Sequence, residues 1–289
     1  MKWERGHVSQ DVEDRRGTPA RGGGALKIGG GGILVVALLA IVGQALGIDL
    51  SGLVGSGGGG GAPAGGPAGG GGPPPPMSAE DKELYDFINF TIDDIQDTFQ
   101  AQFQKDGQSY RRARLVVFTD AVDSGCGTTS SAVGPFYCPP DERAYIDLSF
   151  YRELKSRFGA PGDFAQAYVL AHEIGHHLQK LLGIDERVRS QARRDNQNAL
   201  SVRQELQADC FAGVWAHSTQ HRLLEAGDVD EALGAATAIG DDRLQQKAGM
   251  DVNPETWTHG SSQQRVRWFK RGMESGQFAT CDTFSAADL

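Results

Sequence analysis

The residue types that are scarce in this sequence argue against several classes of protein. Only four of its 289 residues are cysteines and none form a C-x-x-C pair, which argues against a cysteine-rich zinc site. Basic residues are outnumbered, 28 Lys and Arg against 37 Asp and Glu, and the formal net charge of −9 gives no support for nucleic-acid binding. Charge of either sign is missing altogether from residues 28–48, which contain the most hydrophobic run of the protein.

The uncharged stretch predicts a membrane-spanning helix. At 1.5 Å per residue, residues 28–48 would extend about 30 Å, the thickness of one bilayer core. The flanking charges are asymmetric, with Asp49 after the stretch and four cations before it: Arg15, Arg16, Arg21 and Lys27. The positive-inside rule then places the N-terminus in the cytoplasm and makes the protein a single-pass protein of the cell membrane. A cleaved signal peptide ending near Gly43-Gln44-Ala45 is the alternative, and both interpretations put the rest of the chain outside the cytoplasm.

Composition divides the chain into four parts. Residues 1–27 are charged and glycine-bearing with no apolar period, which predicts a disordered cytoplasmic tail ahead of the anchor. Residues 49–77 are mostly Gly, Ala and Pro and predict a flexible, then stiffer, tether. The folded domain is therefore expected at residues 78–289, which is long enough for one buried core.

An H-E-x-x-H pattern lies inside an apolar run of this domain. Gly162-Asp163 is a start signal and the apolar residues that follow recur at helical spacing, so the motif is expected on a helix. Positions i and i+4 share a helix face, so His172 and His176 could direct their imidazoles at one Zn²⁺ ion. Glu173 projects beside them, where a carboxylate can take a proton from an activated water and pass it to a leaving group. The pattern predicts a zinc peptidase.

A third ligand is available on a second predicted helix, which runs from Leu200 to Trp215. Glu205 and Asp209 form another i, i+4 pair on one face of it, in apolar surroundings. Glu205 can complete a His₂Glu ligand set. Asp209, one turn on, can accept the second ring N–H of a ligating histidine and so fix its tautomer.

Periodicity elsewhere predicts an α+β domain, mostly helical with a small sheet. A long amphipathic helix is expected after Ser78, and further helices after Asp228 and after His259. Strands are expected at Ala113–Phe118 and Ala144–Leu148. The second strand or its neighbour is a candidate for the rim of a cleft, where it would pair with extended substrate, although it could equally be interior to the sheet.

The four cysteines are even in number, which suggests two disulfides in an exported domain. We expect Cys126 with Cys138, closing a short loop, and Cys210 with Cys281, tying the C-terminal tail to the second ligand helix. Buried free thiols are the alternative, which would suit a cytosolic domain.

His259 is a further candidate for the site. It stands just ahead of a helix start, and a histidine at such a junction can reach a cleft and donate to the oxyanion of a tetrahedral intermediate. A structural role is the competing interpretation. Arg265, in the helix that follows, is either a second donor or a structural ion-pair partner.

Four separated segments, in this order, resemble the motifs of one bacterial family: 134–139, 172–177, 205–213 and 258–262. It is the putative neutral zinc metallopeptidase family, whose members have a basic start, one membrane span, a Gly/Pro-rich linker and a zincin-like domain. The resemblance covers nearly the whole chain. It implies that His172, His176 and Glu205 bind zinc and that Glu173 is the general base. Thr258-His259 is similar to the Thr-His segment of membrane-associated heat-shock and prenyl-protein metallopeptidases, which favours a catalytic role for His259.

The sequence therefore predicts a membrane-anchored, zinc-dependent enzyme that hydrolyses peptide or protein substrates. A zinc-stabilised exported scaffold without turnover is the alternative, and it would be favoured by a fourth protein ligand in place of water. Hydrolysis of a non-peptide bond by the same His₂Glu geometry is a third possibility.

Overall fold

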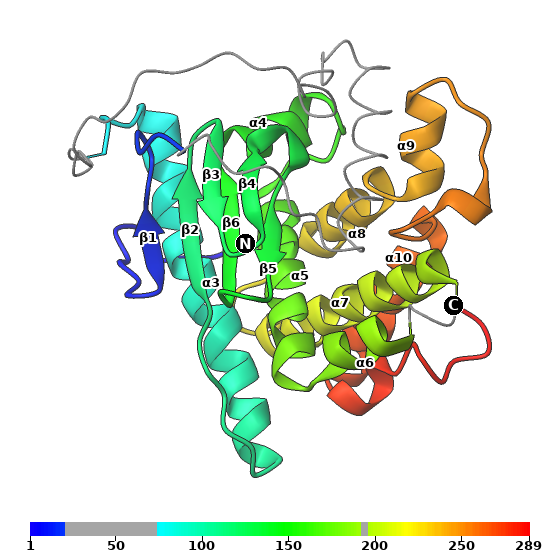
Figure 1. Ribbon diagram of the computed structural model, residues 1–289. Coiled ribbons are helices and arrows are strands. Elements are labelled where there is room, and N and C mark those ends of the chain that lie inside the picture. The colour runs from blue at the N-terminus through cyan, green and yellow to red at the C-terminus, as the bar shows by residue number, and fades with distance from the viewer. Residues whose placement is uncertain (21–73, 192–195) are drawn as a thin grey trace, which may run out of the picture.

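The computed structural model describes residues 1–20, 74–191 and 196–289, and it has the predicted α+β character, with many helices and a small sheet (Figure 1). The strands and their bounds are β1 (Val12–Asp14), β2 (Arg114–Phe118), β3 (Ala121–Ser124), β4 (Gly127–Ser130), β5 (Phe136–Cys138) and β6 (Arg143–Asp147). The helices are α3 (Ala79–Lys105), α4 (Ser149–Ser156), α5 (Asp163–Leu181), α6 (Ile184–Gln191), α7 (Gln197–Thr219), α8 (Asp228–Ala238), α9 (Asp241–Lys247) and α10 (Ser262–Ser275). Short 3₁₀ turns occur at Ser131–Val133, Pro254–Thr256 and Phe278–Cys281.

The main sheet has the strand order β1-β2-β6-β5, with β5 antiparallel to β6 and the other pairs parallel. Because side chains alternate along a strand, Leu115 and Val117 of β2 enter the core with the helices, whereas Val116 and Phe118 face a smaller cluster. That second cluster includes Val122 from the β3–β4 hairpin. The strand predicted at Ala144–Leu148 is interior, so its neighbour β5 is the edge strand on the side of α5.

Helix α3 forms where its apolar spacing predicts it. The hydroxyl of Ser78 accepts from the backbone N–H of Asp81 and caps its N-terminus. Phe87, Ile88, Ile92, Ile95 and Phe99 recur at three and four positions, and all are buried in the main core. This apolar face packs against the sheet and α5, and so α3 covers one side of the helix that carries the motif.

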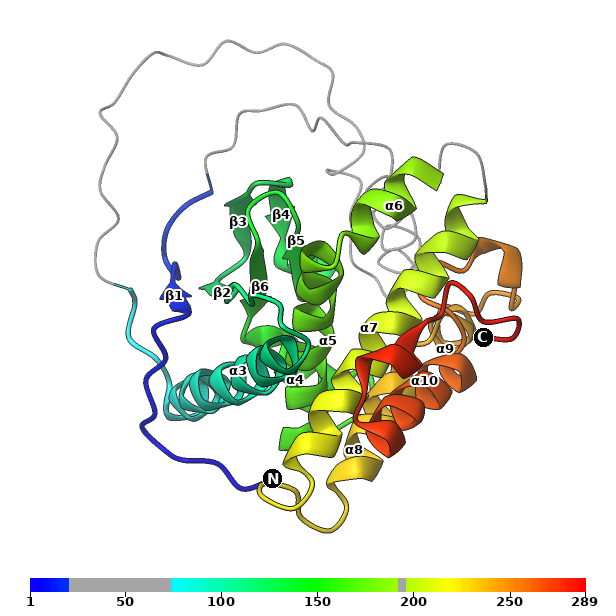
Figure 2. The same ribbon diagram turned by 90° about the horizontal axis from the view of Figure 1, so that it is seen from below.

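Helix α5 carries the H-E-x-x-H motif and lies between the sheet on one side and α7 on the other, with α10 beyond α7 (Figures 1 and 2). Glycines allow these helices to approach closely. A methyl group at Gly175 of α5 would lie 3.0 Å from the Cα of Ala208 on α7. A methyl group at Gly213 of α7 or Gly272 of α10 would overlap the backbone of the facing helix. The backbones of α5 and α7, and those of α7 and α10, are therefore in nearly direct contact.

Residues 1–20 depart from the prediction of a disordered tail. Residues 12–14 form β1, which pairs in parallel with β2 in the register Val12↔Leu115 to Asp14↔Val117. The Met1 side chain is buried in the main core, and the Trp3 ring packs on Phe87 at a centroid distance of 5.5 Å. Backbone pairing and ion pairs hold this segment on the domain, so it can be ordered without an apolar period. The domain boundary expected at residue 78 thus omits an ordered part of the fold.

The anchor expected at residues 28–48 lies outside the described residues, as does most of the tether at 49–77. Among the residues that the structure does describe, none of the helices is long and apolar enough to cross a bilayer.

Both expected disulfides are present. Cys126 is bonded to Cys138, which ties the β3–β4 hairpin to the edge strand β5. Cys210 is bonded to Cys281, which fastens the C-terminal tail to the middle of α7. The prediction of two disulfides with this connectivity is confirmed, and no cysteine is left free.

Replacing Cys210 and Cys281 together by alanine should destabilise the protein more than replacing Cys126 and Cys138. The sequence separations are 71 and 12 residues, so the chain-entropy model gives losses of about 4 and about 3 kcal/mol. Urea unfolding followed by circular dichroism measures both. An equal or larger loss from the shorter loop would contradict the entropic account.

Candidate metal centre and active site

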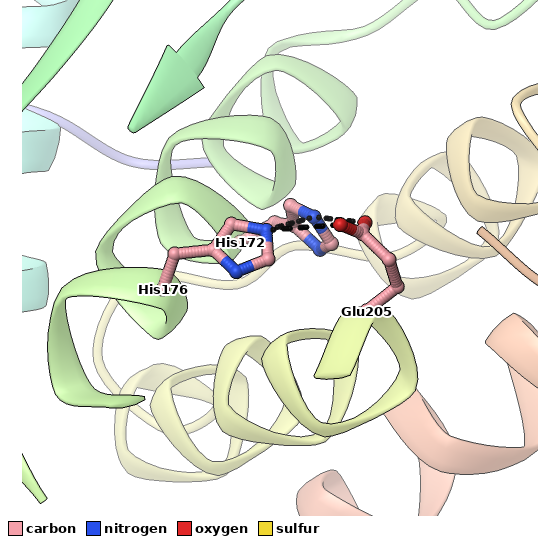
Figure 3. Close-up of side chains that lie close together, drawn as sticks. All are labelled: His172, His176 and Glu205. Atoms are coloured by element: carbon pink, nitrogen blue, oxygen red, sulfur yellow. Dashed lines mark hydrogen bonds and ion pairs between the residues drawn. The ribbon is translucent and has the colours of Figure 1, made fainter. Parts of the chain in front are cut away.

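Three potential ligand atoms meet between α5 and α7 (Figure 3). His172 Nε2 lies 3.1 Å from His176 Nε2 and 3.2 Å from a carboxylate oxygen of Glu205, and His176 Nε2 lies 3.5 Å from the other oxygen. The two histidines come from successive turns of α5, and Glu205 faces them from α7. The three residues predicted as ligands are therefore brought together as one group.

The spacing of these atoms fits a tetrahedral zinc site. Ligands about 2.0–2.1 Å from a tetrahedral ion lie about 3.3 Å from one another, close to the three observed separations. Among the described residues this group has three members, two histidines and a carboxylate, which would leave the fourth position of a tetrahedral ion for water or substrate. The donor set and its geometry fit the ion that the motif predicts.

Each imidazole has its other ring nitrogen engaged by an oxygen acceptor. His172 Nδ1 lies 2.8 Å from Asp209 Oδ1, and His176 Nδ1 lies 2.9 Å from Gln179 Oε1. If both Nδ1 atoms carry the proton and donate it to these oxygens, both Nε2 lone pairs are left for a metal. The contact between Asp209 and His172 is the one expected from the sequence, whereas the Gln179 contact was not foreseen.

Asp209 is fully buried and joins three helices. Its carboxylate accepts from Tyr168 of α5 at 2.5 Å, from His172, and from two guanidinium nitrogens of Arg265 on α10 at 2.8 and 2.9 Å. Burial raises the pKa of Asp209, but the charges of Arg265 and His172 outweigh burial and hold it at about 2. Of the two roles open to Arg265, the structure places it as an ion-pair partner, only 2% exposed.

The charged groups around the three ligand atoms favour the replacement of a bound proton by a metal ion. Burial lowers the pKa of His172, but Asp209 and Glu205 outweigh it and raise the pKa to about 10. Burial likewise opposes ionisation of Glu205, yet the adjacent histidines hold its pKa well below the usual range. Because a metal ligand must be deprotonated at the coordinating nitrogen, binding of Zn²⁺ is expected to release a proton here.

His177, the third histidine of the run, is turned away from the ligand group. Its Nδ1 lies 2.8 Å from the hydroxyl of Tyr137 on β5, and its Nε2 lies 2.6 Å from the carbonyl oxygen of Arg111. Both ring nitrogens are therefore engaged, and burial lowers the pKa of this imidazole. His177 ties α5 to the edge strand and takes no part in the ligand set.

Glu173 is buried beside the ligands, with 8% of its surface exposed. Burial raises its pKa above the usual value, and the nearby His172 and His176 oppose that rise. A carboxylate with a raised pKa is a better proton acceptor than an exposed one, which is the property needed for general-base chemistry.

His259 lies in the loop between α9 and α10, where Asp241 holds it. One oxygen of Asp241 accepts from the successive backbone amides of Thr258, His259 and Gly260 at 2.8, 2.7 and 3.0 Å. The other lies 3.1 Å from His259 Nδ1. Burial lowers the pKa of His259, but Asp241 and Glu205 raise it above its usual value. The loop thus presents an imidazole whose protonated form is favoured by Asp241 and by Glu205 of the ligand group.

Three residues around the site were not predicted from the sequence. Gln179 and Tyr168 could have been identified from their spacing, because they stand three residues after His176 and four before His172, on the motif's own helix. Asp241 gave no local signal. It begins a short helix well before His259, and only the tertiary fold joins the two.

A model of the family described as "Putative neutral zinc metallopeptidase" matches residues 1–284. The chain belongs to this family. The uncharacterized protein YpfJ of Escherichia coli strain K12 is 46% identical over 292 residues, covering 98% of this chain and 99% of that protein. An uncharacterized protein of Mycobacterium tuberculosis strain H37Rv is 49% identical over 192 residues, covering 62% of this chain and 65% of that protein. No solved structure matches.

Substitution of His176 by alanine should abolish stoichiometric zinc binding, whereas His177→Ala should retain it. The two histidines are adjacent in sequence, but only His176 faces Glu205. Atomic emission spectroscopy of the purified full-length variants, equilibrated with limiting zinc, measures the metal content. Loss of zinc from His177→Ala but not from His176→Ala would contradict the assignment of the ligands.

Proposed function

We propose that this member of the family is a zinc-dependent peptidase, with His172, His176 and Glu205 as ligands and Glu173 as general base. The observation that carries the proposal is the convergence of three donor atoms at 3.1–3.5 Å while both imidazoles are anchored through Nδ1. A site prepared in this way supports metal binding with one position open, which is the arrangement of catalytic rather than structural zinc.

Zinc bound here would polarise a water molecule and the substrate carbonyl, and would bring the pKa of the water toward neutrality. Glu173 would accept the proton of that water on a carboxylate oxygen and deliver it to the nitrogen of the leaving amine. Its burial supports this role twice, because it strengthens the base and limits the access of bulk solvent to the proton.

His259 would donate to the oxyanion that develops on the attacked carbonyl. Asp241 lies at Nδ1 of the ring, so the imidazolium would be oriented with Nε2 as the remaining donor. Asp241 also binds the loop through three backbone amides, which would hold the ring in place before substrate arrives. Asp241 is thus proposed as a positioning residue and His259 as the donor.

The edge strand β5 is the proposed rim for substrate. It pairs with β6 on one side only, and Tyr137 at its centre is bonded to His177 of the motif helix. An extended peptide adding to this edge would run past α5, as in recognition by β-augmentation. We place this domain outside the cytoplasm, because two disulfides persist best in an oxidising compartment.

Glu173→Gln should lower kcat by about 10³-fold and leave one zinc bound per chain, because the amide cannot carry the proton. The matched control is Glu186→Gln, which changes a side chain that is 71% exposed. Metal content and cleavage of a peptide library would be measured together on the full-length proteins, with chelator and then zinc added back. Full activity of Glu173→Gln with zinc bound would contradict the role. Bound zinc without cleavage by any variant would favour a zinc-stabilised scaffold.

Asp241→Asn should lower kcat by about 10-fold with little change in KM, since the oriented donor acts on the transition state. Asp242→Asn is the control, because in the described part of the chain the Asp242 carboxylate accepts only from the backbone N–H and hydroxyl of Ser262, at the start of α10. Steady-state kinetics of the two variants and the natural protein make the comparison. Equal losses in both variants would indicate that the carboxylate of Asp241 matters only for the fold of this junction.

A further inference from the structure

The segment 1–20, which the sequence alone suggests is a cytoplasmic tail, is bound along its length to the domain. Its backbone is bonded to the domain at both ends, through Lys2 N to Leu223 O at 2.7 Å and Arg15 N to Val117 O at 2.8 Å. Between these, β1 extends the main sheet beyond β2 (Figure 2). The contact is therefore a continuation of the fold and not a touch at one point.

Charged and polar side chains strengthen this contact on the surface of α3. His7 and Ser9 both bind the carboxylate of Asp93, at 2.7 and 2.8 Å. The carboxylate of Asp11 accepts from Gln96 of α3 at 3.0 Å and from Arg112 just before β2. These bonds join groups that are largely shielded from solvent, where charge-assisted hydrogen bonds are stronger than at an exposed surface.

The end of the N-terminal segment lies next to the start of the main domain. A methyl group on Gly17, near the end of the segment, would lie 2.9 Å from the Cδ atom of Pro75, near the start of the main domain. Residues 21–73, which include the uncharged stretch 28–48, therefore connect two neighbouring points on one surface of the folded protein.

We propose that residues 1–20 and 74–289 lie on the same side of any membrane with which the protein associates. Groups joined by backbone hydrogen bonds cannot be separated by a bilayer core about 30 Å thick. A stretch that crossed the bilayer once between residues 20 and 74 would place the two parts on opposite sides and break every contact described above. The proposal does not depend on the peptidase function.

The cations that favour a cytoplasmic N-terminus have another role in the fold. Arg15 is paired with Glu13 at 2.6 Å, and Arg16 with Asp14 at 2.7 Å. Two of the four cations behind the positive-inside argument are therefore accounted for by the folding of this segment. The two disulfides of the domain favour the oxidising side of the membrane for both parts.

Thiol labelling tests the sidedness directly. Val8 and Val252 are 82% and 42% exposed, one in the segment and one in the main domain, and each would be replaced singly by cysteine in the full chain. The natural protein, whose cysteines are all paired, is the blank. Spheroplasts expressing each variant would be treated with a membrane-impermeant maleimide before and after lysis.

Both cysteines should react before lysis. Reaction of both only after lysis would support a shared side and contradict export. Reaction of one before lysis and of the other only after it would overturn the proposal.

A second measurement tests whether the segment is bound to the folded domain. Asp11→Ala removes a carboxylate that binds the domain, whereas Asp14→Ala removes one that binds Arg16 within the segment. The two side chains are similarly exposed, at 15% and 16%. Asp11→Ala should lower Tm by about 3 °C and Asp14→Ala by less. Identical Tm values for Asp11→Ala and the natural protein would remove the structural basis of the proposal.

Discussion

The buried carboxylate of Asp209 is the constraint on which the centre of this protein depends. It joins α7, on which it lies, to α5 through His172 and Tyr168 and to α10 through Arg265. A buried guanidinium is tolerated only when its charge is matched, so the position of α10 follows from that of Asp209. The same carboxylate orients a proposed zinc ligand. Packing of three helices and the direction of one imidazole are consequently decided by a single group.

This arrangement explains why function and stability are hard to separate here. A change at Asp209 would release His172, but it would also leave Arg265 buried without a counter-charge, which typically costs about 3–5 kcal/mol. Glu173 and His259 are different, because among the described residues neither side chain takes part in an ion pair that joins α5, α7 and α10. They are the positions at which proton transfer and donation to an oxyanion can be examined while the surrounding packing is preserved.

The ligand group could be predicted because its information is local. His172 and His176 share a helix face by their spacing, and Glu205 and Asp209 do the same one helix later, so only the meeting of the two helices had to be assumed. The cysteine pairs were also accessible, since four cysteines allow few combinations. Apolar periodicity was sufficient for α3, α5 and β2.

Elements held by distant partners could not be predicted in this way. Strand β1 has the sequence Val12-Glu13-Asp14, with no apolar alternation, and it becomes a strand only because the edge of β2 offers unpaired backbone groups. Asp241 belongs to the site through a loop that closes against it, and its sequence position resembles an ordinary helix start. In both cases the decisive partner lies elsewhere in the chain, where propensity and spacing carry no information.

The glycine contact between α5 and α7 has a consequence for how a metal would be captured. Because Gly175 sits against the backbone of Ala208, the separation of the two ligand helices is set by contact between main chains and not by adjustable side chains. The entropy of bringing the three donors together is then lost during folding, before any ion arrives. Capture needs only the displacement of a proton and of the ion's own water, so affinity is not reduced by the cost of assembling the site.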